Sequence, residues 1–133
     1  MDKDRFRHDG FEYIAKYFEN SLSELVTRNE GLEQNFRRID ANRFTAAAYL
    51  NGKKLCAGSA SIGASPFSSR GIEYSMTAEP THGGMNEAVS VKNDDQSLYF
   101  EAFGMQSGRD HQKLTFEGAA ELFWEIFIRP IQS

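Results

Sequence analysis

The stretch Leu98-Tyr99-Phe100-Glu101-Ala102-Phe103-Gly104-Met105 decides how the rest of the chain is interpreted. Alternate residues of a β-strand point to opposite faces, and here both alternate sets carry apolar side chains. A strand with one wet face alternates apolar and polar residues, so this strand is either covered on both faces or carries a binding surface. One face would carry Leu98, Phe100 and Ala102, and the other Tyr99, Phe103 and Met105.

Composition predicts one compact domain over residues 1–133, with residues 1–8 as a flexible N-terminus. The net charge of -4 argues against general nucleic-acid binding, which depends on clustered Lys and Arg. Because Cys56 is the only cysteine, an internal disulfide and a cysteine-based zinc cluster are excluded, and a reducing cytoplasm is the expected compartment. No apolar run approaches the roughly 20 residues of a membrane span, so we expect no membrane association.

Two helices are predicted at the ends of the chain. Asp9-Gly-Phe-Glu12 is typical of a capping box, and the apolar stripe that follows ends at Gly31. Thr115 is expected to cap a second helix that ends at Pro130. The apolar arc of this second helix is broader than one sheet face needs, so part of it would meet either the first helix or a second subunit, and we expect a homo-oligomer formed through Trp124 and the C-terminal helix.

The segments between the helices have the two-residue period of strands. Asn51-Gly52 is a strong signal for a two-residue hairpin loop, which would place Leu50 opposite Lys53. A second hairpin is expected with Lys92 opposite Ser97. The expected strands are a run that starts at Phe36 and reaches the Asn51-Gly52 turn, 53–62, 72–78, 87–92 and 97–105. The predicted fold is therefore α+β, a five-stranded antiparallel sheet with both helices packed on one face in a two-layer sandwich.

Two features allow both a structural and a functional interpretation. The predicted register puts Leu55 and Ala57 on the core face and Cys56 on the other, where Cys56 is either a small hydrophobe or a thiol beside Lys54. The residues Arg37, Arg38 and Arg43 form a basic cluster, which is either a solvated strand entry or a contact for an anion or an acidic partner.

The second face of the sheet is the candidate site. Aromatic side chains with an arginine at the rim suit a small planar or anionic ligand or a protein partner, while the alternative is an oligomer interface or a face covered by loops. No cofactor is expected. The ligand- or partner-binding residues proposed for this face and its loops are Tyr49, Arg70, His82, Tyr99, Glu101, Phe103 and Arg109.

The alternative function is a small hydrolase or metal-dependent enzyme. It would use His82 and His111 with an acidic neighbour such as Glu101. The sequence has no H-E-x-x-H spacing and no G-x-S-x-G elbow, so no metal site is assigned and a non-enzymatic binding module is favoured.

Four segments resemble an accessory domain found in bacterial proteins beside Toll/interleukin-receptor (TIR) type signalling domains. These segments are Phe36–Ala47, Asn86–Val91, Asp95–Tyr99 and Leu114–Trp124. The resemblance covers most of the chain from Phe36 onward. It implies a sensing or partner-binding module of a bacterial defence or signalling system.

Overall fold

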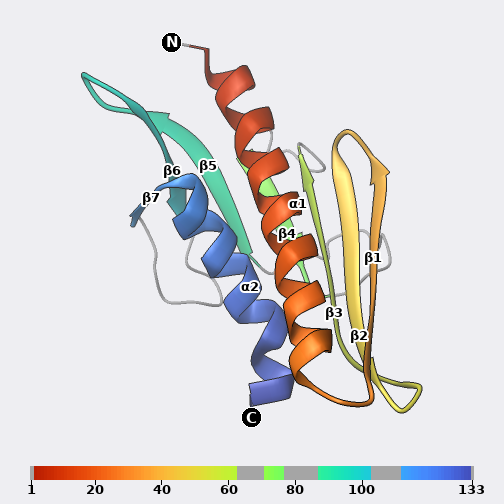
Figure 1. Cartoon of the computed structure of the whole chain (residues 1–133). Coiled ribbons are helices and arrows are strands. Elements are labelled where there is room, and N and C mark those ends of the chain that lie inside the picture. Colours follow the sequence, from red (N-terminus) through yellow and green to blue (C-terminus); the bar gives the residue numbers. More distant parts are fainter. Residues whose placement is uncertain (1, 63–70, 77–86, 103–111, 133) are drawn as a thin grey trace.

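The computed structural model describes residues 2–62, 71–76, 87–102 and 112–132, which form two helices joined by a meandering sheet (Figure 1). The elements are α1 (Lys3–Arg28), β1 (Leu32–Asp40), β2 (Arg43–Leu50), β3 (Lys53–Ile62), β4 (Gly71–Ser75), β5 (Glu87–Asn93), β6 (Leu98–Ala102), β7 (Lys113–Leu114) and α2 (Phe116–Gln132).

The strands pair antiparallel in chain order, β1 to β7, and both helices lie on one face of the sheet (Figure 1). The predicted α+β architecture with an N-terminal and a C-terminal helix is confirmed, but the sheet has seven strands and not five. The first predicted strand is divided by a turn, where the Asp40 carboxylate accepts the Asn42 N–H at 2.7 Å. The additional strand, β7, is only two residues long and pairs with Phe100 and Glu101.

The first helix begins earlier than predicted. Asp2 is the N-cap and accepts the N–H of Arg5 at 3.0 Å, so residues 3–8 belong to α1 and the predicted start at Asp9 is wrong. The early turns are held by packing, because the ring of Phe6 lies 5.0 Å from that of Phe100. The apolar stripe of α1 therefore already includes Phe6, which precedes the Asp9-Gly-Phe-Glu12 pattern that predicts the start of the helix.

The termini of the other predicted elements are confirmed in part. Gly31 has a positive φ of 85°, but α1 ends at Arg28 with an extended Asn29 as its C-cap, so Gly31 lies in the turn that the Leu32 N–H closes on the Asn29 carbonyl at 3.1 Å and is not the helix stop itself. Thr115 caps α2, since its hydroxyl accepts the Gly118 N–H at 3.0 Å. Pro130, however, lies inside α2, which continues to Gln132.

The core is an aromatic cluster between the helices and the sheet. The Phe18 ring of α1 lies 5.2 Å from Phe44 of β2, 6.2 Å from Tyr74 of β4 and 5.7 Å from Phe127 of α2. Trp124 contacts Phe18 edge-on at 5.3 Å. The residue expected at a subunit interface thus packs between the two helices of its own chain.

The first hairpin confirms the turn but changes the faces beyond it. Asn51 and Gly52 have φ values of 52° and 82°, as a type I′ turn requires. Tyr49 pairs with Lys54 and Ala48 with Cys56, so Leu55 is the extra residue of a β-bulge. The bulge reverses the predicted faces of β3, and Cys56 joins the core in place of Leu55 and Ala57.

The second hairpin differs from its predicted register by two residues. Lys92 lies opposite Tyr99 and not opposite Ser97. Because side chains alternate with a period of two, this difference leaves every side chain on its predicted face. Phe100 and Ala102 are buried beneath the helices, while Tyr99 and Glu101 point to the other face.

Arg38 joins the edge of the sheet to α1. Its guanidinium lies 5.0 Å from the centre of the Phe11 ring and donates two hydrogen bonds to the Glu12 carboxylate, one of them 3.1 Å long. The hydrogen bond from Arg38 holds the pKa of Glu12 below its usual value. Of the predicted basic cluster, Arg38 therefore has a structural partner on the helix face.

Gly10 sets how closely α1 approaches the sheet. A Cβ at Gly10 would lie 2.5 Å from the buried Phe100 ring, whereas a Cβ at Gly118 would meet Leu114 at 3.3 Å. We expect Gly10→Ala to lower the free energy of unfolding by about 1 kcal/mol, because overpacking outweighs the gain in helix propensity. Gly118→Ala, the matched control, should be neutral or stabilising. Urea denaturation of the two variants measures both effects, and equal stabilities would contradict the close contact.

The Arg38–Glu12 pair should make stability depend on pH. We expect Arg38→Met to lower the free energy of unfolding at neutral pH by about 1 kcal/mol. The pKa of Glu12 is lowered in the folded state, so the contribution is present above the ordinary value of 4.5 and is lost as the pH falls through the folded pKa. Urea denaturation at pH 7 and pH 3 should show the difference shrinking in acid. Arg28→Met, which removes an exposed pair with Glu24, should change stability less at either pH.

Candidate functional site

On the outer face of the sheet, opposite the helices, the structure describes part of the predicted aromatic platform. Among the described residues of this face, the aromatic side chains are Tyr49 and Tyr99. The centre of the face carries small side chains, of which Ala47, Ser59 and Ala88 are buried.

The two tyrosines are also far from each other. Tyr49 lies on β2 and Tyr99 on β6, four strands apart, which corresponds to about 19 Å across the sheet. Tyr49 is beside the β2–β3 turn and Tyr99 beside the β5–β6 turn, which lie at opposite ends of the sheet (Figure 1). One small molecule cannot contact both, so Tyr49 does not share a small-molecule site with Tyr99.

The other predicted site residues divide into two groups. Glu101 lies on the outer face two residues from Tyr99 and pairs with Lys113 in the sheet register. The rest fall outside the residues that the structure describes: Arg70, His82, Phe103, Arg109 and His111. Within the described ranges, no group of three His, Cys, Asp or Glu side chains is arranged to hold a metal ion.

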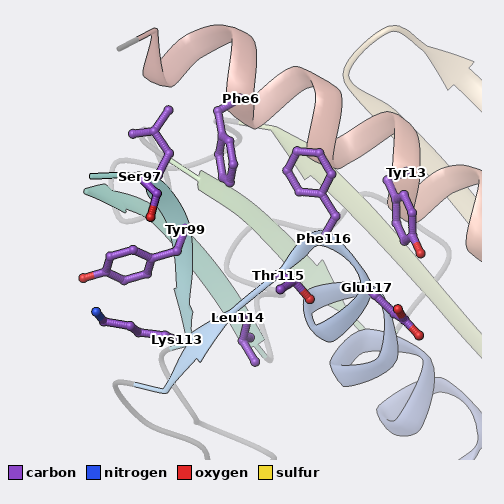
Figure 2. Close-up of a pocket in the computed structure, with 10 residues that line it drawn as sticks. Phe6, Tyr13, Ser97, Tyr99, Lys113, Leu114, Thr115, Phe116 and Glu117 are labelled. Atoms are coloured by element: carbon purple, nitrogen blue, oxygen red, sulfur yellow. The ribbon is translucent and has the colours of Figure 1, made fainter. Parts of the chain in front are cut away.

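A hollow of about 580 Å³ lies where the N-terminal ends of both helices meet the short β7 edge of the sheet. Figure 2 shows the side chains around it, and we call it the β6–β7 hollow. Its lining residues are Phe6, Tyr13, Ser97, Leu98, Tyr99, Lys113, Leu114, Thr115, Phe116 and Glu117.

The apolar wall of the hollow is built by both helices. Phe6 and Tyr13 are seven residues apart on α1, so they lie on one face of that helix. Phe116 opens α2, and its ring lies 4.8 Å from that of Phe6 and 6.0 Å from that of Tyr13 (Figure 2). Tyr13 is 40% exposed, so part of this aromatic wall faces solvent.

A lysine stands at the sheet end of the hollow. Lys113 lies beside Tyr99 in Figure 2, and its ammonium is 4.7 Å from the centre of the Tyr99 ring. The same ammonium lies 3.5 Å from Oδ2 of Asp94. Backbone N–H groups of Gln96 and Ser97 donate to Oδ1 of Asp94 and, with Lys113, hold the pKa of this carboxyl below its usual value. An ammonium has three N–H donors, so one contact with Asp94 leaves donors for a ligand.

The helix end of the hollow is acidic. Glu117 lines it beside Tyr13. Burial raises the pKa of the neighbouring Tyr17, and the charges of Glu121 and Glu117 add to the effect. The lining thus combines a cation on the outer side of the sheet edge with aromatic rings and a carboxylate on the helix side.

Sequence reasoning found only one aromatic residue of this hollow, Tyr99. Phe6, Tyr13, Lys113 and Phe116 were missed as binding residues because they come from three elements, α1, β7 and α2, that are distant in the sequence, and Phe116 was assigned to packing. The available signal was the excess of aromatic side chains at Phe6 and Tyr13, which continue the α1 stripe toward its N-terminal end.

Cys56 is a core residue. It is 6% exposed on the helix face of β3, and burial raises the pKa of its thiol to about 11. The buried Tyr74 hydroxyl approaches the same region over Gly58, where a Cβ would lie 2.1 Å from it. The interpretation of Cys56 as a small hydrophobe fits this position, and an activated thiol beside Lys54 does not.

A model of the Y4lF protein domain matches residues 33–129. The chain belongs to the Y4lF domain family. It is similar to the uncharacterized protein y4lF of Sinorhizobium fredii (strain NBRC 101917 / NGR234), with 52% identity over 98% of this chain and 41% of that protein. The chain therefore spans less than half the length of this curated relative. No solved structure matches significantly.

The described helices were also compared with the requirements of a membrane span. Neither α1 nor α2 combines sufficient length with sufficient apolar character to cross a bilayer.

The buried position of Cys56 predicts its reactivity. We expect the thiol to react with Ellman's reagent at pH 8 only when the protein is unfolded in urea, because access and ionisation are both suppressed in the fold. A Lys54→Cys variant, with an exposed thiol two residues away, should react at once and serves as the control. Rapid reaction of native Cys56 would show that β3 has the predicted register without the bulge.

Proposed function

We propose that this domain is a non-enzymatic binding module that holds a small planar anion in the β6–β7 hollow. The observation that carries this proposal is the Lys113 ammonium, which rests on the Tyr99 ring at the sheet edge and lines the same hollow as the rings of Phe6, Tyr13 and Phe116 on the helix side. The anionic group of the ligand would face Lys113, and its planar body would lie against Phe6 and Phe116. Glu117 disfavours a second anionic group at the other end, so the ligand has one orientation.

Size and chemistry support this choice. A volume of about 580 Å³ falls within the range that small-molecule sites occupy. Aromatic faces stack with planar ligands, and a lysine on a ring is positioned without losing its charge.

The module would act as a sensor, and its place in a TIR-associated defence or signalling system stays a prediction from the resemblance. A cytoplasmic location is proposed on the basis of the single, reduced cysteine.

A fluorescent probe of the same chemistry tests the proposal. 1-Anilinonaphthalene-8-sulfonate is a planar aromatic anion, and N-phenyl-1-naphthylamine is its uncharged counterpart. We expect the anionic dye to bind with enhanced fluorescence and Lys113→Ala to weaken this binding about tenfold, the effect of about 1.4 kcal/mol. Binding of the uncharged dye should be nearly unchanged in Lys113→Ala, whereas Tyr13→Ala should weaken both dyes.

The chain supplies a matched control for these variants. Tyr49 and Lys54 form a second tyrosine–lysine neighbour pair, on the outer face at the distant end of the sheet. Tyr49→Ala and Lys54→Ala should leave dye binding unchanged. The proposal fails if wild type does not bind the anionic dye, or if the Tyr49 and Lys54 variants lose as much affinity as the Tyr13 and Lys113 variants. Circular dichroism of each variant checks that the fold is retained.

A further inference from the structure

The β1 strand is the open edge of the sheet, at the far side from the β6–β7 hollow (Figure 1). Within the part of the chain that the structure describes, no strand lies beyond it. It is nine residues long, and most of its side chains are exposed. A long edge strand presents backbone N–H and C=O groups to which another strand can pair.

The hydrogen bonds of the hairpins show which residues of β1 face outward. Asn51 donates its N–H to the carbonyl of Gly31, and Ile62 donates to Asn42, so odd-numbered residues of β1 bond to β2. The even-numbered residues therefore direct their backbone groups away from the sheet. Within the regular part of the strand these are Leu32, Gln34, Phe36 and Arg38.

Only some self-pairings of this edge are possible. Two copies of β1 related by a twofold axis run antiparallel, and outward-facing residues must lie opposite outward-facing residues. The axis must then pass through a residue and not between two residues. The regular ladder of β1 runs from Leu32 to Arg38, before the bulge between Arg38 and Asp40, and its central residue is Asn35.

The register centred on Asn35 also brings opposite charges together. It places Glu33 of one copy opposite Arg37 of the other, twice by symmetry, with all four side chains exposed on the outer face. These residues would form the closely spaced, non-hydrogen-bonded pairs, in which side chains approach most closely. A register centred on Phe36 would instead place Glu33 opposite Ile39 and require pairing across the bulge.

We propose that β1 pairs antiparallel with β1 of a second copy of this chain, centred on Asn35, to form a continuous sheet across a homodimer. This interface differs from the one predicted through Trp124 and α2, and it does not depend on what the hollow binds. The two Glu33–Arg37 contacts make the register of the dimer specific. The bulge between Arg38 and Asp40 limits how many residues of β1 can pair.

Charge exchange tests the register. Analytical ultracentrifugation of the wild-type chain should show a concentration-dependent dimer. Arg37→Glu would place like charges opposite each other twice and should raise the dissociation constant about tenfold. The double variant Glu33→Arg/Arg37→Glu restores opposite charges and should recover the wild-type value. A monomer at all concentrations, or a double variant no better than Arg37→Glu, would overturn the proposal.

Cross-linking gives a second, independent measurement. In the proposed register Asn35 lies opposite Asn35 of the partner, so Asn35→Cys should form an intermolecular disulfide under mild oxidation. Glu33→Cys is the matched control on the same face, and its two copies would be about 13 Å apart, too far for a disulfide. Mixing Glu33→Cys with Arg37→Cys should produce the mixed disulfide. Equal cross-linking of Asn35→Cys and Glu33→Cys homodimers would refute this register.

Discussion

Two helices share one face of the sheet, and this constraint determines where every other feature of the molecule lies. The first of them, α1, approaches the sheet closely, with Gly10 directly over Phe100. Their aromatic side chains fill the space between the layers, and Phe18 contacts rings from β2, β4 and α2. The helices leave uncovered the β1 edge and the corner at the short β7 strand.

The fold was predictable from the sequence wherever the two-residue period of the strands was unbroken. The second hairpin shows why, since its register differs by two residues and yet Phe100 and Tyr99 keep their predicted faces. The bulge at Leu55 shows the limit, because one extra residue moves Cys56 from the outer face to the core. Nothing in the local sequence around Leu55 marks a bulge, and the Asn51-Gly52 turn alone predicts a register without one. The turn at Asp40 was likewise missed, although Asp40 and Asn42 are residue types that favour turns.

The candidate site was less predictable, for a geometric reason. Residues on one strand face were assumed to be neighbours, but a sheet of seven strands is wide enough to separate Tyr49 from Tyr99 completely. The β6–β7 hollow instead joins Phe6 to Glu117, which are distant in sequence and come together only through the packing of α1 beside α2. Lys113 became relevant because its strand ends after two residues and exposes its side chain beside Tyr99. Such proximity depends on tertiary packing, which no periodicity records.

The family match is shorter than the unit that packs around one core, because it begins after α1. Residues 33–129 include every strand but omit α1, whose Phe11, Ile14, Phe18 and Leu22 are fully buried. Without α1, the sheet face that carries Phe44, Tyr74 and Phe100 would be exposed to water over much of its area, which is unfavourable for a stable domain. The similarity to the Sinorhizobium protein covers 98% of the chain and therefore includes α1. Since Phe6 and Tyr13 also lie on α1, the same helix completes both the core and the aromatic wall of the hollow, and the functional unit must include it.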